Sequence, residues 1–387
     1  MIPTFLSALS ARCVLLCLAL AAVAVLALVL SPYIPVGGDF YWFYYKVPQD
    51  WLAGETRLYD HASRGYFLPP WGIWPYLPLT FLDTFIANAL ANLIAAAVIG
   101  GIAYRQSGSP LIGLLAALCP YSLVLYLTGT PDAWSLLGLW VAWRSSRSGN
   151  GWGLGAGAAL ALVRPQNCLL TLPALVAQAL LPVRTGESAR APLIQASIVL
   201  AVVLVASAFV SGPDWPIRWW ENYFIRPPSP EGAATTYSAL QRLGVPLWFS
   251  GLAGLATAVY SFRRWSSPEH FELLVALNAV LTPFIRSPGY VVLLAIPWAG
   301  LASRRPRLAA AVYAISLPTV VVPAFWDRLA PVWPYMPYFD LLFPVALASV
   351  LLYRDGLSLR GRRPWQSLGR RLGWGLLRFA RNDKGPG

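Results

Sequence analysis

The chain has 387 residues, of which 57% are hydrophobic and only 12% are charged, and its formal net charge is +13. Because roughly a quarter of the residues of a soluble protein are charged, this composition excludes an ordinary soluble protein and favours a membrane protein. The sequence has no glycine-rich phosphate loop and no cluster of His and Cys. Neither a P-loop ATPase nor a zinc site is therefore expected, and no cofactor is predicted.

Apolar segments recur from end to end and predict an all-α, polytopic membrane protein with about 12 transmembrane helices, within a range of about 10–13. The first apolar run, 13–30, is longer than the core of a signal peptide, so we expect it to remain as the first span. Residues 1–353 should form a transmembrane domain and 354–387 a basic tail. The predicted spans are 11–31, 79–104, 110–127, 131–143, 151–163, 167–183, 191–212, 243–262, 270–285, 288–302, 307–323 and 335–353.

The positive charges alternate between the two ends of successive predicted spans. One set of ends carries 20 of the 29 Lys and Arg residues but only five of the 16 acids. Because Lys and Arg collect on the cytoplasmic side, both termini should be cytoplasmic and the loop after the first span should face outward from the plasma (inner) membrane. The tail, 354–387, is either an amphipathic helix on anionic lipid or a soluble basic end. Topology accounts for the basic excess, so nucleic acid is not an expected partner.

The loop after the first span, 32–78, is rich in aromatic residues. A helical spacing places four of its side chains on one face: Phe40, Tyr44, Val47 and Trp51. Pro48 is expected to break or restart that helix, because proline pushes the preceding residue away from the helical region, and Gly54 is expected to end it. We predict one or two short interfacial helices whose rings dip into lipid.

Two roles fit Asp39, which precedes these aromatic residues. An Asp after two glycines can cap the helix that follows. An acid among rings at the membrane surface also has a raised proton affinity, so Asp39 could serve as a general base that takes a proton from a sugar hydroxyl. Tyr44, Tyr45 and Tyr59 are candidates for stacking on sugar rings.

Three arginines lie at predicted outward ends: Arg164 in LVRPQN, Arg242 in TTYSALQRLG and Arg286 in FIRSPGY. A lone arginine there usually ends a span with its charge in the interface. A guanidinium can also hold phosphate oxygens through paired donors, and three arginines on one face favour a phosphate site. Asp132, in TGTPDAW, is predicted to be a helix N-cap.

Several stretches resemble glycosyltransferase family 87, and they occur in the family's order between Gly37 and about Pro297. GGDFYWFYYKVPQDWLAGETRLYD is similar to the family's first outer loop, and FLPPWGIWPYLPL is similar to the segment that follows it. LVRPQN, TTYSALQRLG and LTPFIRSPGY resemble three later motifs. Tyr237 stands where the family usually has Gln.

This resemblance implies a GT-C-type helical bundle that transfers a sugar, typically mannose, from a polyprenyl-phosphate donor to a lipid or glycan acceptor on the outer face. It implies that Asp39 is the base and that no metal is needed. Substrate contacts are expected from Gln166, Tyr237 and Gln241 beside the arginines. Two other classes stay open: a multi-span transporter or flippase, and a non-catalytic membrane partner.

Overall fold

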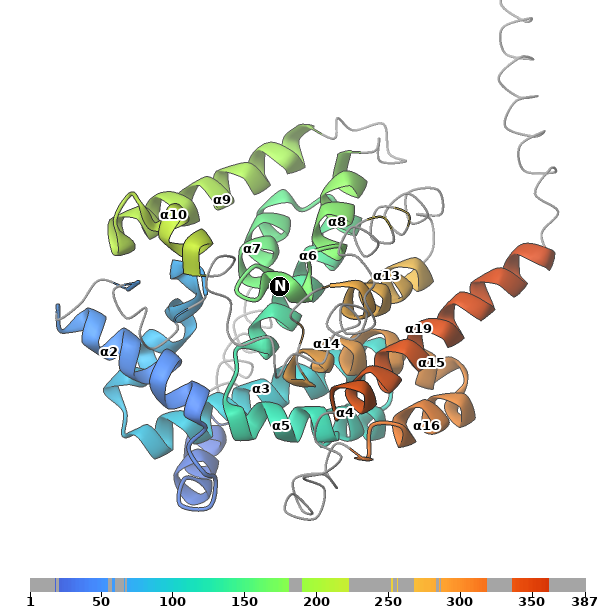
Figure 1. The fold of residues 1–387 in the computed structure, drawn as a ribbon, viewed down its shortest axis with the longest axis horizontal. Coiled ribbons are helices and arrows are strands. Elements are labelled where there is room, and N and C mark those ends of the chain that lie inside the picture. The colour runs from blue at the N-terminus through green and yellow to red at the C-terminus, as the bar shows by residue number, and fades with distance from the viewer. Residues whose placement is uncertain are drawn as a thin grey trace, which may run out of the picture.

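The computed structural model describes residues 18, 21–54, 58–59, 66, 68–180, 190–222, 252, 256, 268–282, 285, 287–318 and 336–361. Over these residues the protein is helical and has no strand, which confirms the predicted all-α class. Figure 1 shows the arrangement. After a first helix, Ala21–Leu30, the elements are η1 (Phe40–Lys46), α2 (Val47–Leu52), η3 (Pro70–Phe81), α3 (Thr84–Ser107), α4 (Pro110–Ala117), α5 (Pro120–Thr128), α6 (Asp132–Ser148), α7 (Gly151–Ala161), η4 (Pro165–Asn167), α8 (Thr171–Leu180), α9 (Arg190–Ser211), α10 (Trp215–Trp220), α13 (Pro268–Leu281), η7 (Ser287–Tyr290), α14 (Val291–Leu293), η8 (Leu294–Trp298), α15 (Ala299–Arg304), α16 (Pro306–Ala314) and α19 (Met336–Gly361).

Two of the described helices are long and apolar enough to cross a membrane, namely α3 and the part of α9 from Ala191 to Ser211. A third span results if α4 and α5, which meet at an angle of 49°, are taken together. Several predicted spans are shorter helices instead. For example, α7 has 11 residues, which at about 1.5 Å per residue is about half the thickness of a bilayer core. Most of 243–262 lies outside the described residues, and a bundle of 12 spans stays a prediction.

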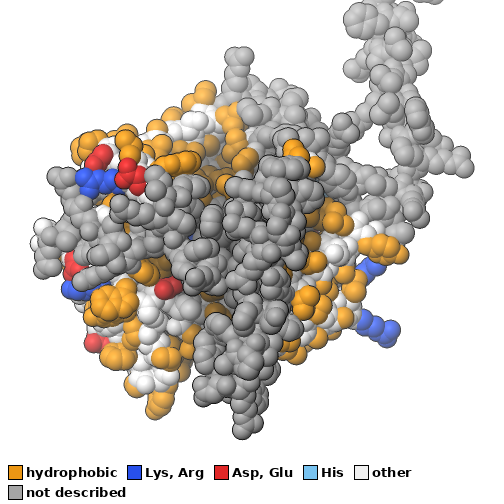
Figure 2. All heavy atoms as spheres, in the orientation of Figure 1, with side chains coloured by type: hydrophobic (Ala, Val, Ile, Leu, Met, Phe, Trp, Pro, Cys, Tyr) orange, Lys and Arg blue, Asp and Glu red, His pale blue; other side chains and the backbone are white. Residues whose placement is uncertain are grey.

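Two elements from predicted outward loops and two elements next to predicted cytoplasmic ends lie toward opposite ends of the view in Figure 1. In Figure 1, α2 and α10 lie at the left, whereas α16 and the far end of α19 lie at the right. In the view of Figure 2, the described charged side chains lie mainly toward these two ends, and the described surface between them is largely hydrophobic. An apolar body between polar ends is the pattern of a protein embedded in a bilayer.

A buried ion pair joins three helices at the end away from the first loop. Glu272 of α13 is fully buried, and its Oε1 accepts hydrogen bonds from Arg304 Nη1 at 3.0 Å and from Gln106 Nε2 at 3.1 Å. Its Oε2 pairs with Arg304 Nη2. Gly300 of α15 leaves the room that this carboxylate needs, because a Cβ there would collide with it. Both oxygens of the buried acid therefore have donors, which limits the cost of burying its charge.

Small residues let α6 and α7 pack backbone against backbone. A Cβ on Gly157 of α7 would lie 2.5 Å from the backbone nitrogen of Ala142 in α6, and a Cβ on Gly138 of α6 would collide with α7 at Ala161. This close contact positions the residues that follow α7, which contribute to the site described below.

We expect Gly157→Ala to destabilise the protein by about 1–3 kcal/mol, because the new methyl group must push α6 away. Thermal unfolding of the purified protein in one detergent measures the effect. Gly101→Ala is the matched control, since Gly101 is also inside a helix but a Cβ there would meet no atom within 4 Å. Equal stability of the two variants would contradict this account of the contact.

The first loop contains two short helices, which agrees with the predicted one or two, and it corrects two details of that prediction. η1 is a π-helix, and α2 follows it directly with Pro48 near its start and Gly54 at φ +72° after its end. Val47 stays helical, with φ −60° and ψ −48°, so the expected effect of Pro48 on it is wrong. The wider π turn leaves room for the proline ring.

The predicted apolar face of this segment is present, but it packs against protein and does not dip into lipid as predicted. Phe40, Tyr44 and Val47 are buried against η3 and neighbouring residues of the first loop, while Tyr41 and Trp42 are the exposed rings. The aromatic loop has enough apolar surface to form a core of its own, which explains the difference. The first loop is therefore a small folded cap on the helix ends.

Candidate functional site

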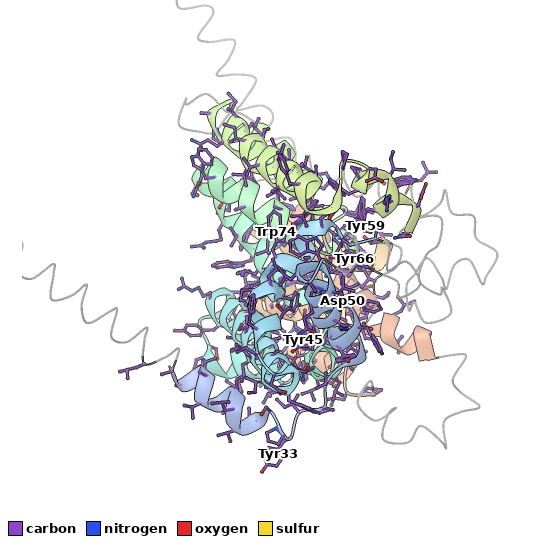
Figure 3. The ribbon with its side chains drawn as sticks, turned by 90° about the vertical axis from the view of Figure 1, so that its left-hand side faces the viewer. Tyr33, Tyr45, Asp50, Tyr59, Tyr66 and Trp74 are labelled. Carbon is purple, nitrogen blue, oxygen red and sulfur yellow. The ribbon has the colours of Figure 1, made fainter. Side chains whose placement is uncertain are left out.

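Four polar contacts hold the first loop together and attach it to the helices beneath it. The Tyr45 hydroxyl donates to the Leu82 carbonyl at 2.7 Å, and the Tyr59 hydroxyl donates to the Leu68 carbonyl at 2.9 Å. The indole N–H groups of two tryptophans also reach the membrane helices: Trp51 Nε1 donates to Val210 O at 3.1 Å, and Trp71 Nε1 donates to Ala159 O at 2.8 Å. Figure 3 looks onto this end, where Tyr59 and Tyr66 lie next to each other, Asp50 and Tyr45 lie below them, and Tyr33 lies at the bottom of the view.

Tyr45 and Tyr59 are therefore structural parts of the cap in this structure. Both rings are buried, and both hydroxyls are bonded to backbone carbonyls. Tyr59 also packs on Tyr66, with ring centroids 5.7 Å apart. The predicted stacking of these two rings on a sugar has no support from this packing.

Arg164 links the first loop to α6. It lies in the turn after α7, and Pro165 holds it out of the helical region at φ −127° and ψ 82°. Its Nη2 donates to the Tyr44 hydroxyl at 3.4 Å, and its Nε is 3.7 Å from Asp132 Oδ2. The Arg164 side chain is 21% exposed and that of Asp132 is 5% exposed. One edge of the guanidinium thus faces a buried acid, and Nη2 is directed to the first loop.

Asp132 is not the predicted N-cap. Pro131 occupies the cap position, and Asp132 is the first residue of α6. Its Oδ1 accepts a hydrogen bond from Asn167 Nδ2 at 2.7 Å. A buried carboxylate is stabilised more by an amide donor and a nearby guanidinium than by one backbone N–H, so the tertiary contacts replace the cap.

A buried asparagine holds the LVRPQN turn in place. Asn278 of α13 donates from Nδ2 to the Gln166 carbonyl at 3.0 Å and accepts at Oδ1 from the Leu170 N–H at 2.8 Å. The side chain of Gln166 is buried in the same turn. Since the turn carries both Arg164 and Asn167, Asn278 positions their side chains indirectly.

The SPGY motif lies against the same two side chains, Asp132 and Asn167. A Cβ on Gly289 of η7 would lie 2.9 Å from Asn167 Oδ1 and 3.4 Å from Asp132 Oδ1. Only a glycine lets η7 approach the two polar side chains this closely. Four stretches far apart in the sequence therefore meet: GGDFYWFYY, TGTPDAW, LVRPQN and SPGY.

Asp39 stands at the start of η1 and makes no capping hydrogen bond with its side chain. The capping role considered for it is therefore wrong. It is half-buried, and its own backbone is helical, with φ −65° and ψ −40°. A residue already inside the helix cannot turn its carboxylate back onto the free N–H groups in the way that a cap does.

The Tyr44 hydroxyl lies within electrostatic reach of three charges. Burial is the main cause that raises its pKa; Arg164 acts in the opposite direction, and the carboxylates of Asp39 and Asp132 raise it further. The ring of Tyr44 is stacked on Tyr76, with centroids 5.0 Å apart. Tyr44 therefore carries a neutral hydroxyl that interacts electrostatically with Asp39, Arg164 and Asp132.

The structure brings together Asp39, Tyr44 and Arg164, with Gln166 in the adjoining turn. Four other predicted site residues lie outside the described residues: Tyr237, Gln241, Arg242 and Arg286. Sequence reasoning missed the roles of Asp132, Asn167 and Asn278. The short interval between Arg164 and Asn167 was a usable signal, since Pro165 starts a tight turn there.

This arrangement suits an anionic, hydroxyl-bearing ligand. A guanidinium can bind phosphate oxygens, and a half-exposed carboxylate can accept a proton. Among the described residues, no group of three or more His, Cys, Asp or Glu is placed to hold a metal ion. The described side chains of this arrangement supply acid–base and electrostatic groups.

No protein-family model, curated protein or solved structure matches the chain significantly. The likeness to glycosyltransferase family 87 therefore rests on the motifs alone. The function has to be argued from the site.

Proposed function

We propose that the protein is a membrane glycosyltransferase of the GT-C type. It moves a sugar, with mannose as the first candidate, from a polyprenyl-phosphate donor to a lipid or glycan acceptor at the outer face of the inner membrane. The observation that carries the proposal is the meeting of Tyr44, Asp132, Arg164 and Gly289, which come from four separate motif-like stretches. The proposal includes a multi-pass bundle of about 12 spans with both termini in the cytoplasm.

In this mechanism Asp39 removes the proton from the acceptor hydroxyl while the oxygen attacks the anomeric carbon. The bond between that carbon and the donor phosphate oxygen breaks, and the polyprenyl phosphate leaves with the bonding electrons. Arg164 stabilises the negative charge on the departing phosphate. Attack from the face opposite the leaving group inverts the anomeric centre.

The position of the site favours an enzyme over a transporter. The cluster lies at the helix ends under the first loop, where Tyr44 of η1 meets Asp132 at the first residue of α6. A transport site is expected near the middle of the membrane, where polar residues line the path of the substrate. A folded cap over the polar cluster instead suits a reaction at the membrane surface.

Proteoliposomes that contain the purified protein test the proposal. They are supplied with polyprenyl-phosphate mannose labelled in the sugar and with acceptor lipids from a bacterial envelope extract. We expect labelled mannose to appear in new glycolipid or glycan products. Movement of the labelled donor across the bilayer without any product would instead assign the protein to the flippases.

Arg164→Ala should raise the KM for the donor at least about 10-fold, because the phosphate loses charge-assisted hydrogen bonds that contribute about 1.5–3 kcal/mol. Initial rates at varied donor concentration measure this change. Arg218→Ala is the control, since Arg218 of α10 lies at the same end but pairs with Asp214 at 2.6 Å in an exposed i,i+4 contact. An unchanged donor KM in Arg164→Ala would rule out the phosphate contact.

A further inference from the structure

The end of α6, before its turn into α7, carries two exposed arginines, Arg144 and Arg147, at an end that the sequence predicts to be cytoplasmic. Neither guanidinium forms a hydrogen bond or an ion pair with any of the described residues. The two arginines are three positions apart on α6, so they share one side of the helix. Their positive charges therefore add on one small surface, which attracts an anion.

Each of these arginines lies over a tryptophan that comes one helical turn earlier. The central guanidinium carbon of Arg144 is 5.7 Å from the ring centroid of Trp140. The same carbon of Arg147 is 5.8 Å from the ring centroid of Trp143. Trp143 is buried and stacks on Phe271 of α13, with ring centroids 4.5 Å apart and the planes at 6°. A cation is attracted to the face of an indole ring, so these rings restrict where the two guanidiniums lie.

The start of a membrane-type helix packs against the same turn. A Cβ on Gly151, the first residue of α7, would collide with the carbonyl of Pro192 in α9. Only 11% of the most apolar window of α9 is buried, and Ile194 near its start is 59% exposed. Trp152 of α7 is 51% exposed, and exposed tryptophan is typical of the depth of lipid headgroups. These features favour a position of the turn at the boundary between acyl chains and water.

We propose that the end of α6 binds the phosphate group of an anionic phospholipid, with Arg144 and Arg147 as its ligands. A guanidinium matches phosphate oxygens with paired donors, and basic sites at the cytoplasmic ends of membrane helices suit anionic headgroups. The indole rings offer no acceptor oxygen, so the N–H groups of both arginines stay available for the phosphate. The inference is independent of the proposed function, because no residue of the candidate site takes part in it.

Native mass spectrometry of the purified full chain in detergent measures lipid binding directly. Phosphatidylglycerol is titrated as the anionic lipid, and phosphatidylcholine, which has no net charge, is the reference. The wild type should bind phosphatidylglycerol more tightly. Arg147→Gln should weaken that binding about five-fold, which corresponds to about 1 kcal/mol for one arginine near an anionic headgroup. Arg144→Gln should have a similar effect, and neither variant should change the binding of phosphatidylcholine.

Arg307→Gln is the matched control, because Arg307 of α16 is exposed at an end also predicted to be cytoplasmic but lies over no tryptophan ring of the described residues. Equal losses in Arg307→Gln and Arg147→Gln would indicate a general effect of net charge and would overturn the inference. Equal binding of the two lipids by the wild type would overturn it as well. Binding of inorganic phosphate alone, with the same dependence on Arg147, would assign the site to a soluble anion and reject the lipid.

Discussion

Asp39→Asn should lower the rate of sugar transfer by about 100-fold or more while the protein still folds and inserts. A positioned general base contributes about 10²–10⁴ to a rate, and an amide cannot accept the proton. The structure makes the variant informative, because the Asp39 side chain makes no capping hydrogen bond whose loss would unfold η1. Single-turnover transfer from labelled donor, with donor binding measured in parallel, separates the rate from the affinity.

Asp50→Asn provides the matched control for this prediction. Asp50 is in the same segment, is 7% exposed in its side chain and pairs with Lys46 at 2.6 Å. Its replacement should affect the stability of α2 but not the transfer rate. If Asp39→Asn and Asp39→Ala both kept the wild-type rate, Asp39 would not be the base, and another residue of the first loop would have to be sought.

Asp132→Ala should destabilise the protein by about 3 kcal/mol, because it removes the buried carboxylate that accepts from the Asn167 amide and lies 3.7 Å from Arg164 Nε. Thermal unfolding in detergent measures the stability. The same variant should also weaken donor binding, since Asp132 orients the Nε edge of Arg164. Its role is that of a positioning residue, because it acts through the arginine.

Asp132→Asn distinguishes positioning from simple loss of packing. An asparagine keeps an oxygen for Asn167 Nδ2 and should recover part of the stability, but without a negative charge it should not restore donor affinity. Asp83→Ala is a reference for an ordinary cap, since Asp83 accepts from Phe85 N–H at 2.9 Å at an exposed helix start and should cost about 1 kcal/mol. A loss in Asp132→Ala no larger than this would contradict the buried pair.

The two aspartates show where local sequence rules stop. Asp39 and Asp132 each stand next to the start of a helix, where an N-cap is the favoured interpretation. In the structure neither side chain caps its helix. The donors that hold Asp132 come from the turn after α7, more than 30 residues away, and no local pattern reveals them.

In the first loop, by contrast, local sequence patterns predict most of the structure. Its spacing predicts one or two short helices and a shared face for Phe40, Tyr44, Val47 and Trp51. Two helices are present, the first three side chains are buried, and Trp51 is partly buried. The spacing does not reveal whether this face packs against lipid or against protein. Burial depends on the partner surface, and that surface belongs mainly to η3 and to other residues of the first loop.

By itself, the sequence determined the helical class, the presence of apolar membrane-type helices and the choice of Asp39, Tyr44 and Arg164 as candidates. Composition and helical periodicity are local properties, so they can be read without knowing the fold. Only the tertiary structure decided that Asp132 and Asn167 join Arg164 and that Gly289 approaches them. Those contacts depend on how closely separate helices pack, because a change of one methyl group between α6 and α7 would move the turn that carries the arginine.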